Sequence, residues 1–310
     1  MGRELRAIDA LLSGLIDYAG LFPPASESMR TAVQNYAAYQ NGADSVALGR
    51  FIVPVTRLAE FEDQARDLLP QGVGSDPWKV SALVAGDVRG AGEELLRFNA
   101  RHASGSAAGR ATIDVVELKS SEPGDIERQR SALPQGFTPY FEIPAEPNVE
   151  SLVQTLASIG ARAKIRTGGV TPDAFPSSRD ILDFMVACQR HGVPFKATAG
   201  LHHPVRGHYR LTYDAGSGTG LMFGFLNVFA GAAMLRTGQG VDVAAAVLEE
   251  TDASAFSFTD DAIMWRDRRI EVDQIVDLRS HFAVSFGSCS FREPVDELAA
   301  LDRSQLAQQS

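Results

Sequence analysis

The sequence predicts one α/β domain built as a TIM-like (β/α)8 barrel with an N-terminal helical extension. Short apolar segments alternate with helix-length segments along most of the chain, and the helix-length segments carry apolar residues at three- and four-residue spacing. The length of 310 residues suits one barrel with terminal additions, and no long linker, low-complexity block or fixed-period repeat divides the chain.

Eight segments have the length and apolar character of barrel strands. They are residues 47–53, 78–85, 112–118, 138–143, 162–167, 194–200, 255–259 and 283–287. The expected helices on the outside of the sheet are residues 57–69, 93–101, 125–133, 149–159 and 179–191, followed by an apolar, buried helix over 223–235. Next to the seventh strand, residues 263–272 also have the pattern of an inserted hairpin.

Two helical patterns precede these segments, over residues 4–18 and 28–40. The Pro23-Pro24 pair separates them, because proline disfavours helix in the residue before it. We therefore expect residues 1–44 to be helices that flank the barrel and residues 45–310 to form the barrel domain. The aromatic and proline-rich segment 17–24 is expected to lie over one barrel mouth.

Composition excludes several classes of protein and partner. Apolar residues make up 45% of the chain and charged residues 22%, as in ordinary globular domains. A net charge of −10 without a run of Lys or Arg argues against nucleic-acid binding. No window has the roughly 18 uncharged apolar residues of a membrane span, so we expect a cytoplasmic protein. Cys188 and Cys289 have the pattern of separate thiols, with Cys188 as core filler.

Charged residues stand at the carboxyl ends of consecutive predicted strands, where barrels place their active sites. Glu117, Glu142, Lys164, Arg166 and Lys196 all occupy such positions. Because side chains alternate along a strand, Lys164 shares a face with Arg166, and Lys196 shares one with Thr198. One interpretation is a structural ion-pair network. The other is a binding site for an anion, since cations outnumber carboxylates in this set within an acidic chain.

A lysine in this setting has a chemical consequence. Neighbouring positive charge and partial desolvation both lower a lysine pKa, so we expect Lys164 to lower that of Lys196. An amine tuned in this way can attack a carbonyl group and form a Schiff base.

Two of these strands resemble those of deoxyribose-phosphate aldolases. The segment Lys196-Ala-Thr-Ala-Gly200 resembles their Lys-Thr-Ser-Thr-Gly strand, and Lys164-Ile-Arg-Thr-Gly168-Gly169 resembles their second-lysine strand, Lys-Ala-Ser-Gly-Gly. The segment 113–116 is similar to their strand that bears an acid–base aspartate, here Asp114. The resemblance implies class I aldolase chemistry, although in that family the Schiff-base strand precedes the second-lysine strand. Asp114 and Glu117 cannot both point inward without a bulge, and we expect Glu117 to do so.

Residues in the loops after the strands complete the expected site. Gly168 and Gly169 allow backbone N–H groups to approach an oxyanion, although an ordinary tight turn is an equal alternative. Ser288, after the last strand, lies where barrels often bind phosphate. His202 and His203 follow the sixth strand, and one of them is expected to enter the site.

We expect an aldolase-like carbon–carbon lyase that acts on a small phosphorylated or carboxylated carbonyl compound without a cofactor. Lys196 is the expected nucleophile, and Glu142 and Glu117 are expected to move protons. Arg166 and the glycine turns are expected to hold the anionic group, and Thr198 is expected to help bind the substrate. One alternative is a metal-assisted enolising lyase or hydrolase, in which the two glutamates and one histidine bind a divalent cation. The other is a non-catalytic barrel that binds a small molecule. Homo-oligomerisation is left open.

Overall fold

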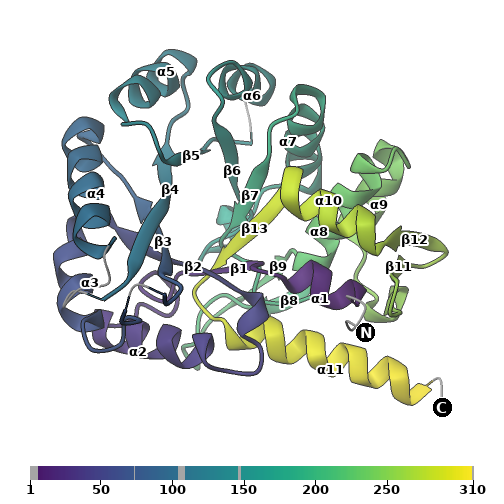
Figure 1. The fold of residues 1–310 in the computed structure, drawn as a ribbon. Coiled ribbons are helices and arrows are strands. Elements are labelled where there is room, and N and C mark those ends of the chain that lie inside the picture. The colour runs from purple at the N-terminus through teal and green to yellow at the C-terminus, as the bar shows by residue number, and fades with distance from the viewer. Residues whose placement is uncertain (1–5, 73, 104–108, 146–147, 309–310) are drawn as a thin grey trace.

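In the computed structural model, which describes residues 6–72, 74–103, 109–145 and 148–308, eight parallel strands close into a barrel (Figure 1). The order around the barrel is β1-β13-β7-β6-β5-β4-β3-β2. The strands are β1 (Ile16–Tyr18), β2 (Leu48–Pro54), β3 (Trp78–Leu83), β4 (Ala111–Lys119), β5 (Thr138–Glu142), β6 (Arg162–Arg166), β7 (Phe195–Thr198) and β13 (Ala283–Ser288). The predicted (β/α)8 fold is confirmed.

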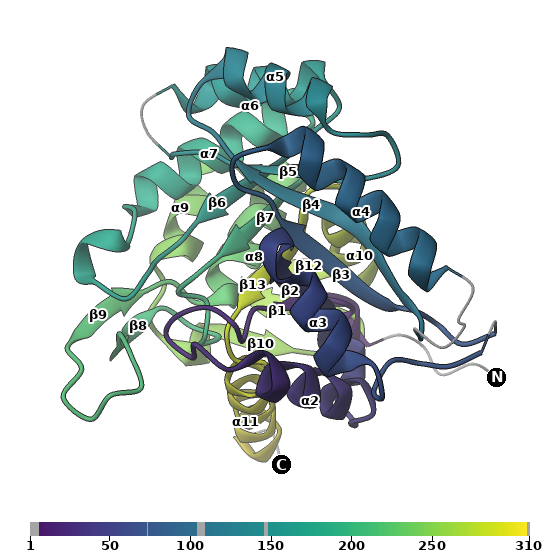
Figure 2. The ribbon, with the colours of Figure 1, turned by 90° about the vertical axis from the view of Figure 1, so that its left-hand side faces the viewer.

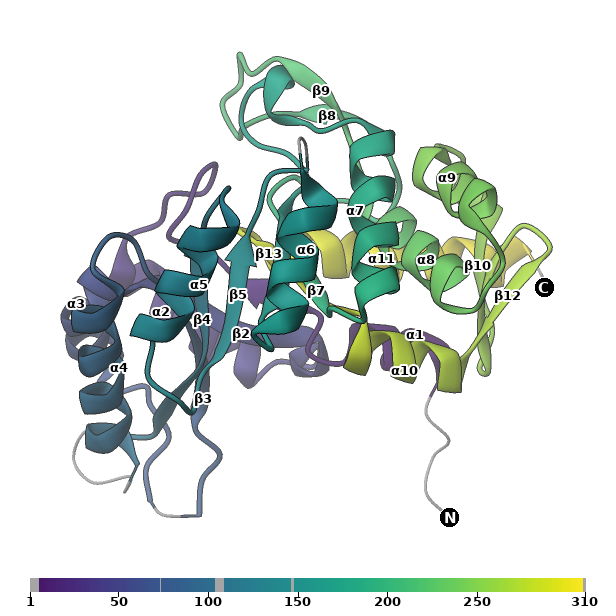
Figure 3. The same ribbon diagram turned by 90° about the horizontal axis from the view of Figure 1, so that it is seen from above.

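A helix follows each barrel strand and packs on the outside of the barrel, as seen from above in Figure 3. In barrel order along the chain these are α2 (Met29–Gln40), α3 (Leu58–Ala65), α4 (Val88–His102), α5 (Pro123–Ala132), α6 (Val149–Ser158), α7 (Ser178–His191), α8 (Phe225–Arg236) and α11 (Arg292–Gln308). Further helices are α1 (Ala7–Leu12), α9 (Val241–Glu249) and α10 (Val272–His281), and short 3-10 turns are η1 (Ser45–Ala47), η2 (Val55–Arg57), η3 (Pro172–Ala174) and η4 (Ala253–Ala255).

Local sequence explains where several helices begin and end. Ser177 and Asp180 form a capping box at the start of α7, and Gly192 ends that helix with a φ of 65°, a conformation that favours glycine. Ser28 caps α2 by accepting a hydrogen bond from the backbone N–H of Thr31. The predicted buried helix at 223–235 is confirmed as α8, which is apolar on all sides and lies in the core.

The N-terminal prediction is wrong in part. Residues 7–12 are helical as α1, but Ile16–Tyr18 is the barrel strand β1, which pairs with β13 on one side and β2 on the other. Residues 4 and 5 of the predicted helix lie outside the described residues. The segment 1–44 therefore supplies a strand and its following helix to the barrel, so the proposed division at residue 44 does not separate the barrel from an extension.

The seventh predicted strand is also wrong as a barrel strand. Residues Phe256–Phe258 form β10, which pairs antiparallel with β11 (Ala262–Trp265), and β11 pairs with β12 (Arg268–Glu271). This small sheet lies outside the barrel, so the hairpin pattern at 263–272 was the better interpretation (Figure 1). A second antiparallel hairpin, β8 (Gly207–Arg210) and β9 (Thr219–Met222), follows β7.

An irregularity in β4 determines which of its acidic residues faces the barrel interior. The register with β3 shifts so that Val80 pairs with Ile113 and Ser81 pairs with Val115, which leaves Asp114 as the extra residue of a bulge. Asp114 forms a two-point ion pair with Arg50, at 2.7 and 2.6 Å. Beyond the bulge Glu117 is 1% exposed, as expected for an inward side chain.

Within the described ranges, none of the helices combines the length and the apolar character that crossing a membrane requires.

Candidate functional site

A chain of alternating charges lies inside the barrel at the carboxyl ends of its strands. Lys196 Nζ contacts Asp17 Oδ2 at 2.8 Å and Glu117 Oε1 at 2.5 Å. Lys164 Nζ contacts Glu117 Oε2 at 2.8 Å and Glu142 Oε2 at 3.0 Å. Strand register places Glu142, Lys164 and Lys196 side by side on β5, β6 and β7. We call these five residues the ionic cluster.

Polar groups on neighbouring strands fix the carboxylates of the ionic cluster. Ser81 Oγ donates a hydrogen bond to Glu117 at 2.7 Å, and Ser285 Oγ donates one to Asp17 at 2.9 Å. The backbone N–H of Arg50 donates to the other oxygen of Asp17 at 2.8 Å. Both carboxylates are therefore held in one orientation, with their charge compensated in the interior.

The electrostatics correct one expectation about Lys196. Burial alone would lower the pKa of Lys196, but its ion pairs with Asp17 and Glu117 outweigh burial and raise that pKa above its usual range. The predicted lowering by Lys164 is wrong, because Glu117 lies between the two ammonium groups and attracts both. Burial would likewise raise the pKa of Glu117, yet the two lysines hold it well below its usual range.

Two more cations approach the ionic cluster from its exposed side. Arg166 Nε lies 3.6 Å and Lys119 Nζ lies 3.5 Å from Glu142 Oε1. Burial raises the pKa of Glu142, but its contact with Lys164, assisted by Arg166 and Lys119, lowers that pKa overall. The side chain of Arg166 is 52% exposed, so its guanidinium remains available to a ligand.

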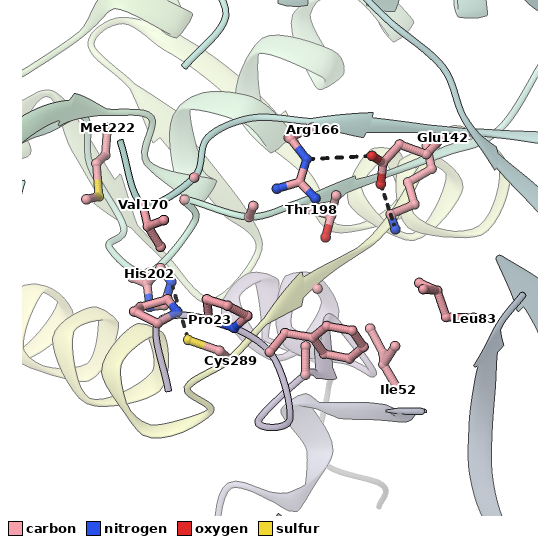
Figure 4. Close-up of a pocket in the computed structure, with 18 of the residues that line it drawn as sticks. Pro23, Ile52, Leu83, Glu142, Arg166, Val170, Thr198, His202, Met222 and Cys289 are labelled. Atoms are coloured by element: carbon pink, nitrogen blue, oxygen red, sulfur yellow. Dashed lines mark hydrogen bonds and ion pairs between the residues drawn. The ribbon is translucent and has the colours of Figure 1, made fainter. Parts of the chain in front are cut away.

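A cavity of about 750 Å³ opens above the ionic cluster at the barrel mouth. Glu117, Glu142 and Lys164 form part of its wall, whereas Lys196 lies beneath these residues, 1% exposed, and is not among the described residues that line the cavity. Apolar side chains face the charged wall, as Figure 4 shows for Ile52 and Leu83. The cavity therefore joins charged and apolar surfaces, which is typical of sites for small molecules.

Two segments line this cavity from outside the strands. The loop between β1 and α2 contributes Phe22, Pro23 and Pro24, which confirms the expected position over a barrel mouth for this loop, whereas Asp17 and Tyr18 of the predicted segment 17–24 belong to the buried strand β1. The β8–β9 hairpin and the turn that joins its strands contribute Leu211 and Tyr213 among other residues, and the hairpin projects beyond the barrel in Figure 2.

The predicted histidines both line the cavity and pair with carboxylates of α11. His202 Nδ1 lies 2.7 Å from Glu293, and His203 Nδ1 lies 2.9 Å from Glu297. Burial would lower the pKa of His202, but its hydrogen bonds with Cys289 and Glu293 outweigh burial and raise that pKa to about 10. These contacts favour the protonated form of the His202 ring.

The remaining predicted residues divide between cavity wall and packing. Thr198 and Gly169 line the cavity. Gly168 packs against the Phe175 ring, where an added Cβ would lie 2.4 Å from a ring carbon, so close packing accounts for this glycine. Ser288 is buried, its hydroxyl accepts a hydrogen bond from the backbone N–H of Ser290, and it is not among the described residues that line the cavity.

The predicted metal ligands do not converge on one point. Lys164 lies between Glu117 and Glu142, whereas His202 and His203 pair with α11. The part of the chain that the structure describes contains no group of three or more His, Cys, Asp or Glu residues placed to hold a metal ion.

Three residues of this region are not among the site residues that the sequence predicts. Asp17 stands on a strand of three residues whose sequence continues the helical pattern before it. Cys289 and Glu293 line the same cavity from the chain that follows β13. Their position after the last barrel strand is a signal that could have identified them, because loops at that edge form the sites of parallel barrels.

The fold and the site together define an α/β-barrel protein whose mouth holds a cavity above a buried ionic cluster. The chain matches no protein-family model and no curated protein sequence. Among solved structures it is similar to a nitroalkane oxidase from Streptomyces ansochromogenes, with a TM-score of 0.31 and 15% identity over 64% of this chain and 62% of that chain. A likeness of this size carries no inference about chemistry, so the resemblance to deoxyribose-phosphate aldolases stays a prediction.

Proposed function

We propose that this protein is a carbon–carbon lyase that acts on a small anionic β-hydroxy carbonyl compound through a Schiff base on Lys164. The observation that carries the proposal is the position of Lys164, whose ammonium group lies between Glu117 and Glu142 in the wall of the cavity. Lys196, the nucleophile expected from the sequence, lies beneath that wall and is assigned instead to holding Glu117 in place.

The choice of lysine at these positions supports amine chemistry. The chain contains four lysines, and Lys119, Lys164 and Lys196 all meet at this mouth, whereas the fourth, Lys79, is exposed on β3. Arginine is the residue usually favoured for buried ion pairs, because its planar guanidinium matches a carboxylate at two points. A lysine can lose its proton and act as a nucleophile, which arginine cannot do in proteins.

The charges around the cavity favour an anionic substrate. Lys119 and Arg166 approach Glu142 from the solvent side, so the cluster with these two residues holds four cations and three carboxylates. A carboxylate or phosphate group of the substrate compensates the extra positive charge at Arg166, which offers a planar fork of donors.

The reaction uses these groups in sequence. Glu142 accepts a proton from Lys164, the free amine adds to the substrate carbonyl, and loss of one water leaves an iminium. The iminium accepts the electron pair of the bond between the α- and β-carbons while a carboxylate removes the β-hydroxyl proton. An aldehyde departs and leaves an enamine on Lys164. Protonation of the enamine and addition of one water release the second product and the free lysine.

Borohydride trapping tests the proposal directly. The protein is incubated with pyruvate, glyoxylate or glycolaldehyde phosphate in the presence of borohydride, and the adduct is read by intact mass and peptide mapping. We expect an adduct on Lys164 that Lys164→Met abolishes and that the matched control Lys79→Met retains. Absence of any adduct, or an adduct on Lys196 instead, contradicts the proposal. Thermal stabilisation by these compounds without an adduct favours the non-catalytic binding barrel.

A further inference from the structure

A second reactive group lies at the other end of the cavity from the ionic cluster. Cys289 Sγ lies 3.8 Å from His202 Nε2, and His202 Nδ1 lies 2.7 Å from Glu293 Oε2. Figure 4 shows His202 and Cys289 together, apart from Glu142 and Arg166. The order thiol, imidazole, carboxylate is the arrangement by which enzymes activate a nucleophile, because the carboxylate orients the ring and the ring exchanges a proton with the thiol.

The geometry of α11 shows that Glu293 is directed toward His202. Ser290 Oγ accepts a hydrogen bond from the backbone N–H of Glu293, as in the capping of a helix N-terminus. The pattern Ser-x-x-Glu is that of a capping box, in which the glutamate returns to the serine backbone. Here the Glu293 carboxylate bonds instead to His202 and, at 2.9 Å, to the hydroxyl of Tyr213.

The surroundings of Cys289 differ from those of Cys188. Cys188 lies on the face of α7 that packs into the core, where burial raises the pKa of its thiol. Cys289 lines the cavity and lies three residues before Arg292, the first residue of α11, whose N-terminal dipole favours negative charge. A neighbouring imidazolium and a helix N-terminus both promote the reactivity of cysteines.

We propose that Cys289, with His202 and Glu293, forms an acyl-transfer site that hydrolyses thioesters or activated esters of small acids. The Cys289 sulfur attacks the acyl carbon, the bond to the thiol or alcohol breaks, and the leaving group takes a proton from His202. Water then attacks the acyl-cysteine, gives one proton to His202 and releases the acid, with the Cys289 sulfur as leaving group. Tyr213, whose hydroxyl lies 3.9 Å from Sγ, places the β8–β9 turn over the intermediate.

Cys188 serves as an internal control for the reactivity of Cys289, because the chain has two cysteines and both are free thiols. The full-length protein is mixed with p-nitrophenyl acetate and with S-acetyl-N-acetylcysteamine, and p-nitrophenol release and acetyl adducts are followed by absorbance and peptide mass mapping. We expect a burst of p-nitrophenol and one acetyl group on Cys289 in the wild type and in Cys188→Ala. Cys289→Ala abolishes both, and His202→Asn slows acylation by about 10²-fold or more.

Glu293→Gln keeps the shape of the side chain and removes its charge, so it provides a second measurement if another variant is unstable. We expect this variant to slow acylation by about tenfold or more, because the His202 ring loses its anionic partner. Acetylation of Cys188 or of lysines at a comparable rate, or unchanged bursts in Cys289→Ala or Glu293→Gln, overturns the proposal. Borohydride trapping detects an adduct on Lys164, whereas acylation detects an adduct on Cys289. The two experiments therefore test the two proposals independently.

Discussion

Replacing Lys196 by Met tests whether the ionic cluster is balanced as described. Its ammonium group contacts two carboxylates at 2.8 and 2.5 Å, and the side chains of Lys196, Asp17 and Glu117 are each 1% exposed. Glu117 keeps Lys164 in the variant, but Asp17 keeps only the neutral donors Ser285 and the Arg50 backbone among its described contacts. Removing one partner of a buried pair costs about 3–5 kcal/mol, so we expect the free energy of unfolding to fall by that amount.

A double-mutant cycle measured by equilibrium urea denaturation identifies the cause. In Lys196→Met/Asp17→Asn the stranded carboxylate is gone, so we expect the loss to be smaller than the sum of the two single losses by about 1–3 kcal/mol. Lys79→Met, at an exposed position of β3, serves as the matched control and should change stability by no more than about 0.5 kcal/mol. If Lys196→Met lowers the free energy of unfolding by only about 1 kcal/mol, as expected for an exposed ion pair, the buried ionic cluster does not contribute as described.

Three further predictions concern pH and packing. The pKa of Glu117 is lowered in the folded state, so this residue stabilises the fold above its ordinary pKa of about 4.3 and less so as the pH falls below that value. Between about pH 5 and pH 3 the melting temperature should therefore fall less steeply in Glu117→Gln than in the wild type. The pKa of His202 is raised to about 10, so its contribution to stability is complete below about pH 6.5 and is lost as the pH rises toward about 10. In His202→Asn the melting temperature should decline less over this pH range than in the wild type. An equal decline in both proteins argues against a charged His202 ring. Gly168→Ala brings a Cβ to 2.4 Å from the Phe175 ring and should cost about 1–3 kcal/mol in urea denaturation, whereas Gly124→Ala in α5, whose nearest neighbour lies at 3.5 Å, should be neutral or slightly stabilising.

The sequence could predict those strands whose apolar runs are long enough to be distinctive. β4, with nine residues, and β13, with six, stand out against the helices around them. β1 has three residues and follows α1 after a short turn, so its apolar side chains continue the helical pattern. β10 is an equally short apolar segment, but its partner is an antiparallel neighbour, and the choice between partners depends on contacts distant in sequence.

The sequence is enough to predict which charged residues meet at the barrel mouth, but not which of them line the cavity and which are buried beneath it. Alternation and strand order are enough to bring Glu142, Lys164 and Lys196 to one mouth of the barrel. Which lysine faces the cavity depends on the layers of side chains inside the closed barrel. Asp17 and Glu117 together raise the pKa of Lys196, and Asp17 comes from a strand that the sequence pattern does not distinguish from the preceding helix, so the direction of that shift could not be predicted from the sequence.

The place of β1 in the barrel has a consequence for how the chain folds during synthesis. Asp17 and Ser285, which form a hydrogen bond in the finished barrel, are separated by 268 positions. The ribosome therefore completes β2 through β7 before β13 exists to hold β1, and the long loop that must close makes this pairing slow. In the finished barrel β13 lies between β1 and β7, so we expect the step that closes the barrel also to bring Asp17 to Lys196 and give that lysine its second counter-charge.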